Sequence, residues 1–166
     1  RLRELSVEEL VAETKPLVNA ILEADEHDPV GIYFKGRIAL AGNDLLQAVG
    51  LFEEAIGRDA TLAGPHLYLG LARLAQGRAD SAQDELREAI RLQPDNEAAH
   101  LTLAKLYLAQ QKPAEGEKEA RQALRLNPSS LEAAVVYGDT LVLGKNWTKA
   151  EEVYGAIVRQ LPGHPI

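Results

Sequence analysis

The sequence contains no cysteine and no methionine, and aromatic residues make up only 5% of it. The absence of cysteine excludes a disulfide framework, a thiolate nucleophile and a cysteine-based zinc site. No apolar run reaches the roughly 18 residues that a membrane helix needs, so we expect no membrane insertion. Because the chain begins at Arg1 and has no methionine, we expect it to be part of a longer protein.

Basic residues are outnumbered, and the formal net charge of the chain is −7. No basic stripe is present, which argues against a nucleic-acid partner. The acidity is concentrated in residues 1–28, where three basic and eight acidic residues give a balance of −5. A solvated helix face is the simplest interpretation of this charge, and an edge that attracts a basic partner is the alternative.

A period of 34 residues runs through most of the chain. Small or apolar residues recur at this interval in four gapless copies, which is typical of a repeat protein. Such proteins present a surface to a partner more often than they carry a catalytic site. The four columns are Gly36, Gly70, Ala104 and Gly138; Ala48, Ala82, Gly116 and Ala150; Phe52, Leu86, Ala120 and Tyr154; and Ala55, Ala89, Ala123 and Ile157.

Each copy divides into two segments with helical apolar spacing, separated by a turn that contains Gly, Asn or Pro. The small columns predict that the two helices of a copy approach closely where they cross. We therefore expect an all-α chain. The predicted helices cover residues 7–26, 30–42, 45–58, 63–76, 79–92, 97–110, 113–126, 131–144 and 147–160.

The second copy carries the clearest signature, with Tyr68-Leu69-Gly70, then Ala82, and Pro94 near its end. This pattern resembles the tetratricopeptide repeat, a helical hairpin of 34 residues, and the resemblance covers residues 29–162. It implies a right-handed solenoid of four units preceded by a partial unit. The expected divisions are an N-terminal helical segment at 1–28, then repeats at 29–62, 63–96, 97–130 and 131–166.

The segment before the first repeat carries its own apolar face. Extending the period backward places Ile21 in the same column as Ala55 and Ala89, so residues 15–26 are expected to be the second helix of a preceding unit. Pro16 lies too deep for the first turn of a single helix, which predicts a kink or break near Lys15.

No catalytic or cofactor-binding motif is present, and we expect neither an enzyme nor a bound metal. His66 and His100 occupy equivalent slots about one repeat apart, a separation that does not favour a shared metal ion. We interpret them as packing residues. The paired carboxylates Glu53-Glu54 and Glu151-Glu152 face different directions on a helix, so they do not form an acid–base pair.

The resemblance implies that the first helix of each unit lines an inner, concave surface. Here this surface is largely apolar with two cations, which suits a protein or peptide partner that is helical or apolar. The alternative is that its leucines only pack between repeats. The predicted partner-binding residues are Tyr33, Arg37, Leu67, Leu71, Leu101, Lys105, Val135 and Asp139.

We therefore interpret the chain as a protein-interaction scaffold. The Ala- and Leu-rich composition resembles that of bacterial members of the family. The location of the protein is therefore left open between the cytoplasm and the periplasm. Three alternatives remain at this point. They are a component of an envelope or exopolysaccharide-export assembly, a targeting segment of an enzyme whose catalytic domain lies elsewhere, and self-association through uncovered solenoid ends.

Overall fold

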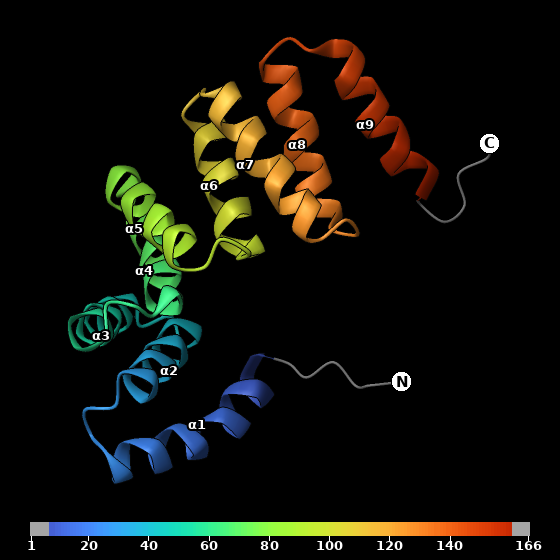
Figure 1. Ribbon diagram of the computed structural model, residues 1–166. Coiled ribbons are helices and arrows are strands. Elements are labelled where there is room, and N and C mark those ends of the chain that lie inside the picture. Colours follow the sequence, from blue (N-terminus) through green and yellow to red (C-terminus); the bar gives the residue numbers. More distant parts are fainter. Residues whose placement is uncertain (1–6, 161–166) are drawn as a thin grey trace. The chain divides into compact units, whose positions relative to one another are not determined.

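The computed structural model describes the backbone of residues 7–160 and the side chains of residues 11–159. Every regular element in this range is an α-helix, which confirms the predicted all-α fold (Figure 1). Consecutive helices from α2 onward form antiparallel hairpins. The helices are α1 (Val7–Ala24), α2 (Pro29–Ala41), α3 (Leu45–Arg58), α4 (Ala63–Ala75), α5 (Ala79–Leu92), α6 (Glu97–Ala109), α7 (Pro113–Leu126), α8 (Leu131–Leu143) and α9 (Trp147–Gln160).

The contacts divide the chain into two compact units at Leu92, so that α1–α5 form the first unit and α6–α9 the second. The first unit contains the hairpins α2–α3 and α4–α5, with α1 packed on α2. The second unit contains the hairpins α6–α7 and α8–α9. The first helices of the four hairpins begin at residues 29, 63, 97 and 131, so the structure keeps the 34-residue period of the sequence.

Short polar side chains start several of these helices. The Oδ1 atom of Asp28 accepts a hydrogen bond from the Gly31 amide at 2.6 Å, and Asp44 and Asn96 cap α3 and α6 in the same way. Each cap satisfies an amide that has no partner inside its own helix. The caps therefore fix where each helix begins.

The turn inside each hairpin contains one residue with a left-handed backbone. These residues are Asn43, Gly77, Gln111 and Lys145, with φ angles between 59° and 73°. They stand 34 residues apart, although only one of them is the glycine that this conformation favours. The hairpin as a whole therefore determines the turn conformation, and only one of the four positions carries the residue type that this conformation favours.

The sequence predicted a kink or a break near Lys15, and the prediction of a break is wrong, because α1 runs through Pro16 as one helix. Proline removes one backbone hydrogen bond from the helix, but Pro16 itself is exposed while Val18 is only 3% exposed. The side chains of Ile21 and Leu22 lie directly against Gly31 of α2. Packing of the second half of α1 on α2 thus holds the helix together despite the proline.

The two helices of each hairpin touch where one of them carries a small residue. A Cβ atom added at Gly36 would lie 2.7 Å from the Phe52 ring, and one added at Gly138 would lie 2.6 Å from the Tyr154 ring. At Gly70 it would lie 3.0 Å from Leu86. In three hairpins a glycine therefore makes room for a large side chain on the opposite helix. In the third hairpin the corresponding pair is Ala104 and Ala120, both fully buried.

His66 and His100 pair with glutamates across their own hairpins, which the sequence analysis did not foresee. The Nδ1 atom of His66 lies 2.7 Å from Oε2 of Glu85, and the Nδ1 atom of His100 lies 2.7 Å from Oε2 of Glu119. The Nε2 atom of His100 also lies 3.1 Å from the carbonyl oxygen of Pro94. Each pair joins the first helix of a hairpin to the second, so both histidines contribute to hairpin packing.

Burial alone would raise the pKa of the Glu119 carboxyl. The hydrogen bond and charge of His100, with a smaller contribution from Lys118, outweigh burial and leave this pKa below its ordinary value of 4.5. A carboxyl group whose pKa is lowered by folding stabilises the fold above its unfolded pKa. That stabilisation disappears as the pH falls through the folded pKa.

Replacing Gly70 with Leu should destabilise the chain by about 1–3 kcal/mol, because the added atoms would overlap Leu86 at the helix contact. Urea denaturation followed by circular dichroism at 222 nm measures the change. A midpoint equal to that of the parent would mean that this contact does not constrain the hairpin.

A second pair of variants isolates the contact itself. Gly70→Ala should destabilise the parent chain but should be neutral or stabilising in a Leu86→Ala background, since that background reproduces the alanine pair of the third hairpin. Away from a steric contact, alanine in a helix is favoured over glycine by about 1 kcal/mol. The same penalty in both backgrounds would contradict the proposed role of Leu86.

Glu119→Gln should lower the urea midpoint at pH 7, and the difference from the parent should shrink and disappear as the pH falls through the lowered pKa of the Glu119 carboxyl. The sign follows from the lowered pKa of Glu119, because the carboxylate stabilises the fold only while it is ionised. Glu115→Gln, an equal charge change at an exposed site on α7, serves as the control. A difference that grows toward low pH would contradict the assignment.

Candidate peptide-binding surface

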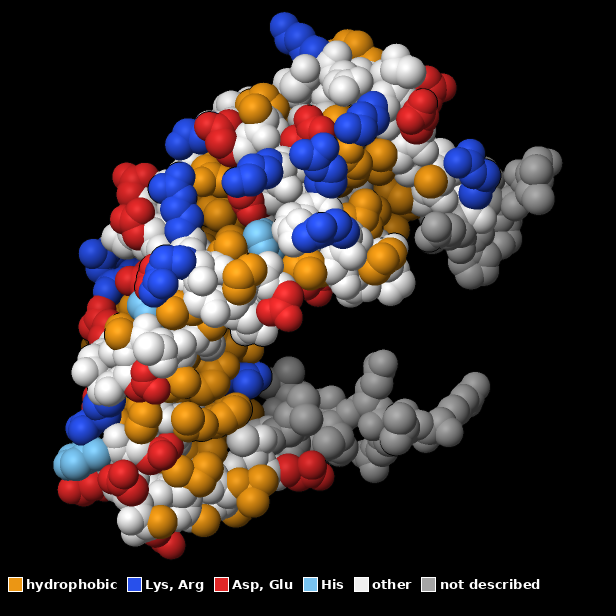
Figure 2. Space-filling view, viewed as in Figure 1, with side chains coloured by type: hydrophobic (Ala, Val, Ile, Leu, Met, Phe, Trp, Pro, Cys, Tyr) orange, Lys and Arg blue, Asp and Glu red, His pale blue; other side chains and the backbone are white. Residues whose placement is uncertain are grey.

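The predicted residues of the first unit lie on two neighbouring helices. Tyr33 and Arg37 belong to α2, Leu67 and Leu71 belong to α4, and these two helices are in contact. Hydrophobic side chains gather over α2 in Figure 2. We call these four residues, with the surface around them, the α2–α4 face.

Aromatic rings form the centre of the α2–α4 face. The ring of Tyr33 lies 4.9 Å from that of Phe34, 6.3 Å from that of Phe52 and 5.8 Å from that of Tyr68, measured between centroids. All these pairs are tilted, an arrangement that aromatic side chains favour. The cluster connects α2, α3 and α4, and we call it the aromatic platform.

The guanidinium of Arg37 lies over this platform. Its Cζ atom is 4.7 Å from the ring centroid of Tyr68, 5.5 Å from that of Phe34 and 5.8 Å from that of Tyr33. All three distances are within the range of cation–π attraction. No carboxylate among residues 11–159 forms an ion pair with Arg37, so its charge is balanced by ring faces instead of an anion.

The absence of a side chain at Gly64 leaves room for the ring of Tyr33. A Cβ atom added at Gly64 would lie 2.8 Å from the Tyr33 ring. Burial raises the pKa of the Tyr33 hydroxyl above its ordinary value, and the charge and hydrogen bonding of Arg37 offset part of that rise. Tyr33 is therefore a neutral, packed support for Arg37 at physiological pH.

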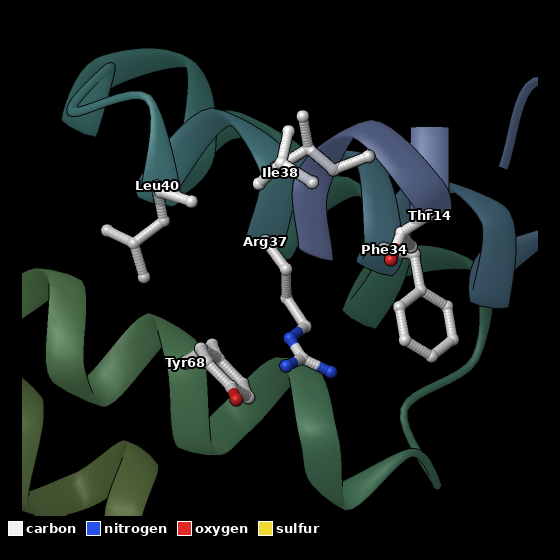
Figure 3. Close-up of a pocket in the computed structure, with 8 residues that line it drawn as sticks. Thr14, Phe34, Arg37, Ile38, Leu40 and Tyr68 are labelled. Carbon is white, nitrogen blue, oxygen red and sulfur yellow. The ribbon is translucent and has the colours of Figure 1, made fainter. Parts of the chain in front are cut away.

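A pocket of about 370 Å³ opens beside Arg37. In Figure 3 the Arg37 side chain extends from α2 toward Tyr68 of α4, and the Phe34 ring lies on the other side of the guanidinium. The wall of the pocket is mainly apolar. Its lining residues are Val11, Thr14, Phe34, Arg37, Ile38, Leu40, Ala41 and Tyr68.

The predicted residues of the second unit lie on α6 and α8, which are also in contact. We call Leu101, Lys105, Val135 and Asp139 the α6–α8 face. Its cation is already paired, because the Nζ atom of Lys105 lies 2.5 Å from Oε1 of Glu132. Val135 is 37% exposed and is the accessible apolar residue of this set.

Asp139 is also engaged within the second unit. Its Oδ1 atom accepts a hydrogen bond of 2.5 Å from the Tyr154 hydroxyl. Burial, together with the hydrogen bond and charge of Asp139, raises the pKa of Tyr154 to about 12. Tyr154 therefore stays protonated and continues to donate to Asp139 throughout the physiological range.

Leu67 and Leu101 are each only 7% exposed, and Leu101 belongs to the buried core of the second unit. Leu71 is partly exposed, and Arg37 and Lys105 are exposed. Of the predicted residues, the polar ones are accessible, and so are the apolar residues Leu71 and Val135. Leu67 and Leu101 lie beneath the surface. A contact of these eight residues with a partner remains a prediction.

Sequence reasoning missed several residues of the pocket. Phe34 and Ile38 each follow a predicted position by one residue and were not assigned to the face, and Tyr68 was noted only as part of the repeat signature. Val11 and Thr14 could not be assigned because the direction of α1 was not foreseen. The adjacent aromatic pair at 33 and 34 is the signal that could have indicated the cluster.

The described part of the chain contains no group of three metal-binding side chains and no helix long and apolar enough to cross a membrane. A second, smaller pocket of about 160 Å³ lies in the second unit beside α9 and includes Leu124, Val153 and Ile157 in its lining.

Comparison with known proteins identifies the class. A sequence profile described as tetratricopeptide repeat matches residues 33–97 and 101–165, and a second profile with the same description matches residues 73–122. The matches cover well over half of the chain. The chain therefore belongs to the tetratricopeptide repeat family.

Solved structures agree with this assignment at the level of the fold. One similar structure is YrrB, described as a tetratricopeptide repeat protein with an unusual peptide-binding site, with a TM-score of 0.81 and 20% sequence identity over 89% of this chain and 76% of YrrB. The pilF protein of Pseudomonas aeruginosa has a TM-score of 0.79 and 20% identity over 93% of this chain and 70% of its own. MamA has a TM-score of 0.77 and 16% identity, with 92% and 87% covered. No curated protein sequence matches the chain.

Proposed function

We propose that the chain is a protein-interaction scaffold that binds a peptide or an amphipathic helix on the first helices of its hairpins. The observation that carries this proposal is the aromatic platform of the α2–α4 face, with Arg37 lying over it beside an apolar pocket. Family membership supports it, since tetratricopeptide repeats present surfaces to partners. The peptide-binding site named for YrrB supports it by analogy of fold.

The accessible residues suit a partner that binds through apolar anchors. Aromatic side chains and arginine are enriched at the energetically important positions of protein interfaces. The α2–α4 face offers both, and Leu71 extends its apolar surface along α4. On the α6–α8 face, Val135 offers an anchor point next to the Lys105–Glu132 pair.

The titratable groups that could suggest catalysis have structural partners. His66 and His100 pair with glutamates inside their hairpins, and Asp139 pairs with Tyr154. These pairs hold helices together, so they favour a binding role over a catalytic one.

The test is selection from a displayed library of nine-residue peptides against the purified chain, followed by fluorescence polarisation with the enriched peptides. Leu71→Asp or Val135→Asp should weaken binding by about 2 kcal/mol or more, as loss of an anchor commonly does. Because both side chains are at least partly exposed, the variants should remain folded, and circular dichroism verifies this. Salt should weaken binding only mildly, because apolar contacts are not screened.

Leu46→Asp provides the matched control, because Leu46 is 81% exposed and lies on α3, away from the first helices. This variant should bind the enriched peptides as the parent does. If Leu46→Asp abolishes binding while Leu71→Asp and Val135→Asp leave it unchanged, the interaction surface is not on the first helices.

A further inference from the structure

We infer that the pocket beside Arg37 recognises a peptide segment in which an apolar side chain lies next to a single Asp or Glu. The apolar side chain enters the pocket and the carboxylate binds the Arg37 guanidinium. This inference rests on the proposed function and specifies its ligand chemistry for the first unit.

The size and lining of the pocket determine the apolar part of the ligand. A volume of about 370 Å³ is at the small end of the range for ligand sites, roughly 300–1,000 Å³. Phe34, Ile38 and Leu40 supply an apolar wall from α2, and Val11 adds to it from α1. Such a site favours an aliphatic or aromatic side chain over a fully polar one.

The state of Arg37 determines the charged part of the ligand. Its guanidinium contacts three ring faces, which restrict its motion without using its in-plane donors in an ion pair. A guanidinium has five N–H donors, so the hydrogen bonding of Arg37 to Tyr33 leaves others that can bind a carboxylate. Because the rings hold the group in place, little side-chain freedom is lost when the carboxylate binds.

Lys105 shows that the two predicted cations are not equivalent. Lys105 stands in the same column of the repeat, but Glu132 already neutralises it at 2.5 Å. A ligand carboxylate would have to displace Glu132 there, whereas no described carboxylate needs to be displaced at Arg37. The anion-binding member of the pair is therefore Arg37.

The surroundings favour one carboxylate over an acidic run. Among the described residues that line the pocket, Arg37 alone is charged. One carboxylate is enough to match this single charge, and a run of several would leave negative charge uncompensated. The exposure of α2 on both sides of Arg37, at Val30 and Ala41, lets a bound chain continue in both directions, so we assign the carboxylate to an internal side chain.

The experiment uses the same displayed nine-residue library, and the enriched sequences are then synthesised with an acetylated N-terminus and an amidated C-terminus. Peptides enriched on the parent chain should carry Asp or Glu next to a large apolar residue. For one enriched peptide, changing its acidic residue to the amide should weaken binding to the parent by about three- to fivefold, the upper part of the range for an exposed charge pair.

Arg37→Gln should remove this difference, so that the acidic and amide peptides bind within twofold of each other. Arg37→Lys should retain part of it, because lysine keeps the charge but loses the planar fork. Lys105→Gln is the matched control and should leave the difference unchanged. Near-ultraviolet circular dichroism of the tyrosines verifies that the ring cluster survives each substitution.

Two outcomes separate this inference from the proposed function. Enrichment of apolar peptides with no acidic preference, or an acidic preference that Arg37→Gln leaves intact, overturns the inference while peptide binding stands. Failure of the parent chain to enrich any peptide overturns both. The enriched peptides are also synthesised with a free C-terminal acid, and binding that requires this free acid overturns the internal source assigned to the carboxylate.

Discussion

The close approach of the two helices in each hairpin is the constraint on which the rest of the structure depends. In three hairpins a glycine leaves room for Phe52, Leu86 or Tyr154 from the opposite helix. In the remaining hairpin, α6–α7, an alanine pair fills the same space. The size of one residue is thus matched to the size of another on the partner helix. This match fixes how the first helix of a hairpin lies, and hence which of its residues remain accessible.

The histidine–glutamate pairs act on the same helix contact. They occur in the second and third repeats, between residues that are 19 positions apart in both cases. The first repeat has Ile32 and Leu51 at these positions, and the fourth has Ala134 and Val153. An apolar contact tolerates sliding better than a buried hydrogen bond, because a buried donor or acceptor without a partner is costly. The polar pairs therefore make the register of the two middle hairpins more specific.

The period, the helices and the close contacts could be predicted from the sequence because they repeat. A column of small residues is visible in four copies, and its meaning follows from packing alone. The cluster of Tyr33, Phe34 and Tyr68 occurs once and involves adjacent positions, so no periodic pattern indicates it. The continuity of α1 could not be predicted either, because local propensity at Pro16 favours a break and only packing on α2 overrides it. Leu101 belongs to a buried cluster that also includes residues of α7, α8 and α9, and the position of Leu101 on the expected surface does not reveal this packing.

A single column of the repeat shows how specificity arises on a regular scaffold. Positions 37, 71, 105 and 139 are equivalent, and they carry Arg, Leu, Lys and Asp. The repeated backbone gives all four similar positions on their helices, but the neighbours differ. Rings surround Arg37, Glu132 neutralises Lys105, and Tyr154 donates to Asp139. The repeat therefore determines where side chains can meet a partner, while departures from the repeat determine which of them keep an unsatisfied charge. Arg37 has no ion pair with a described carboxylate, its hydrogen bonding is to the neutral Tyr33, and it borders the larger of the two pockets.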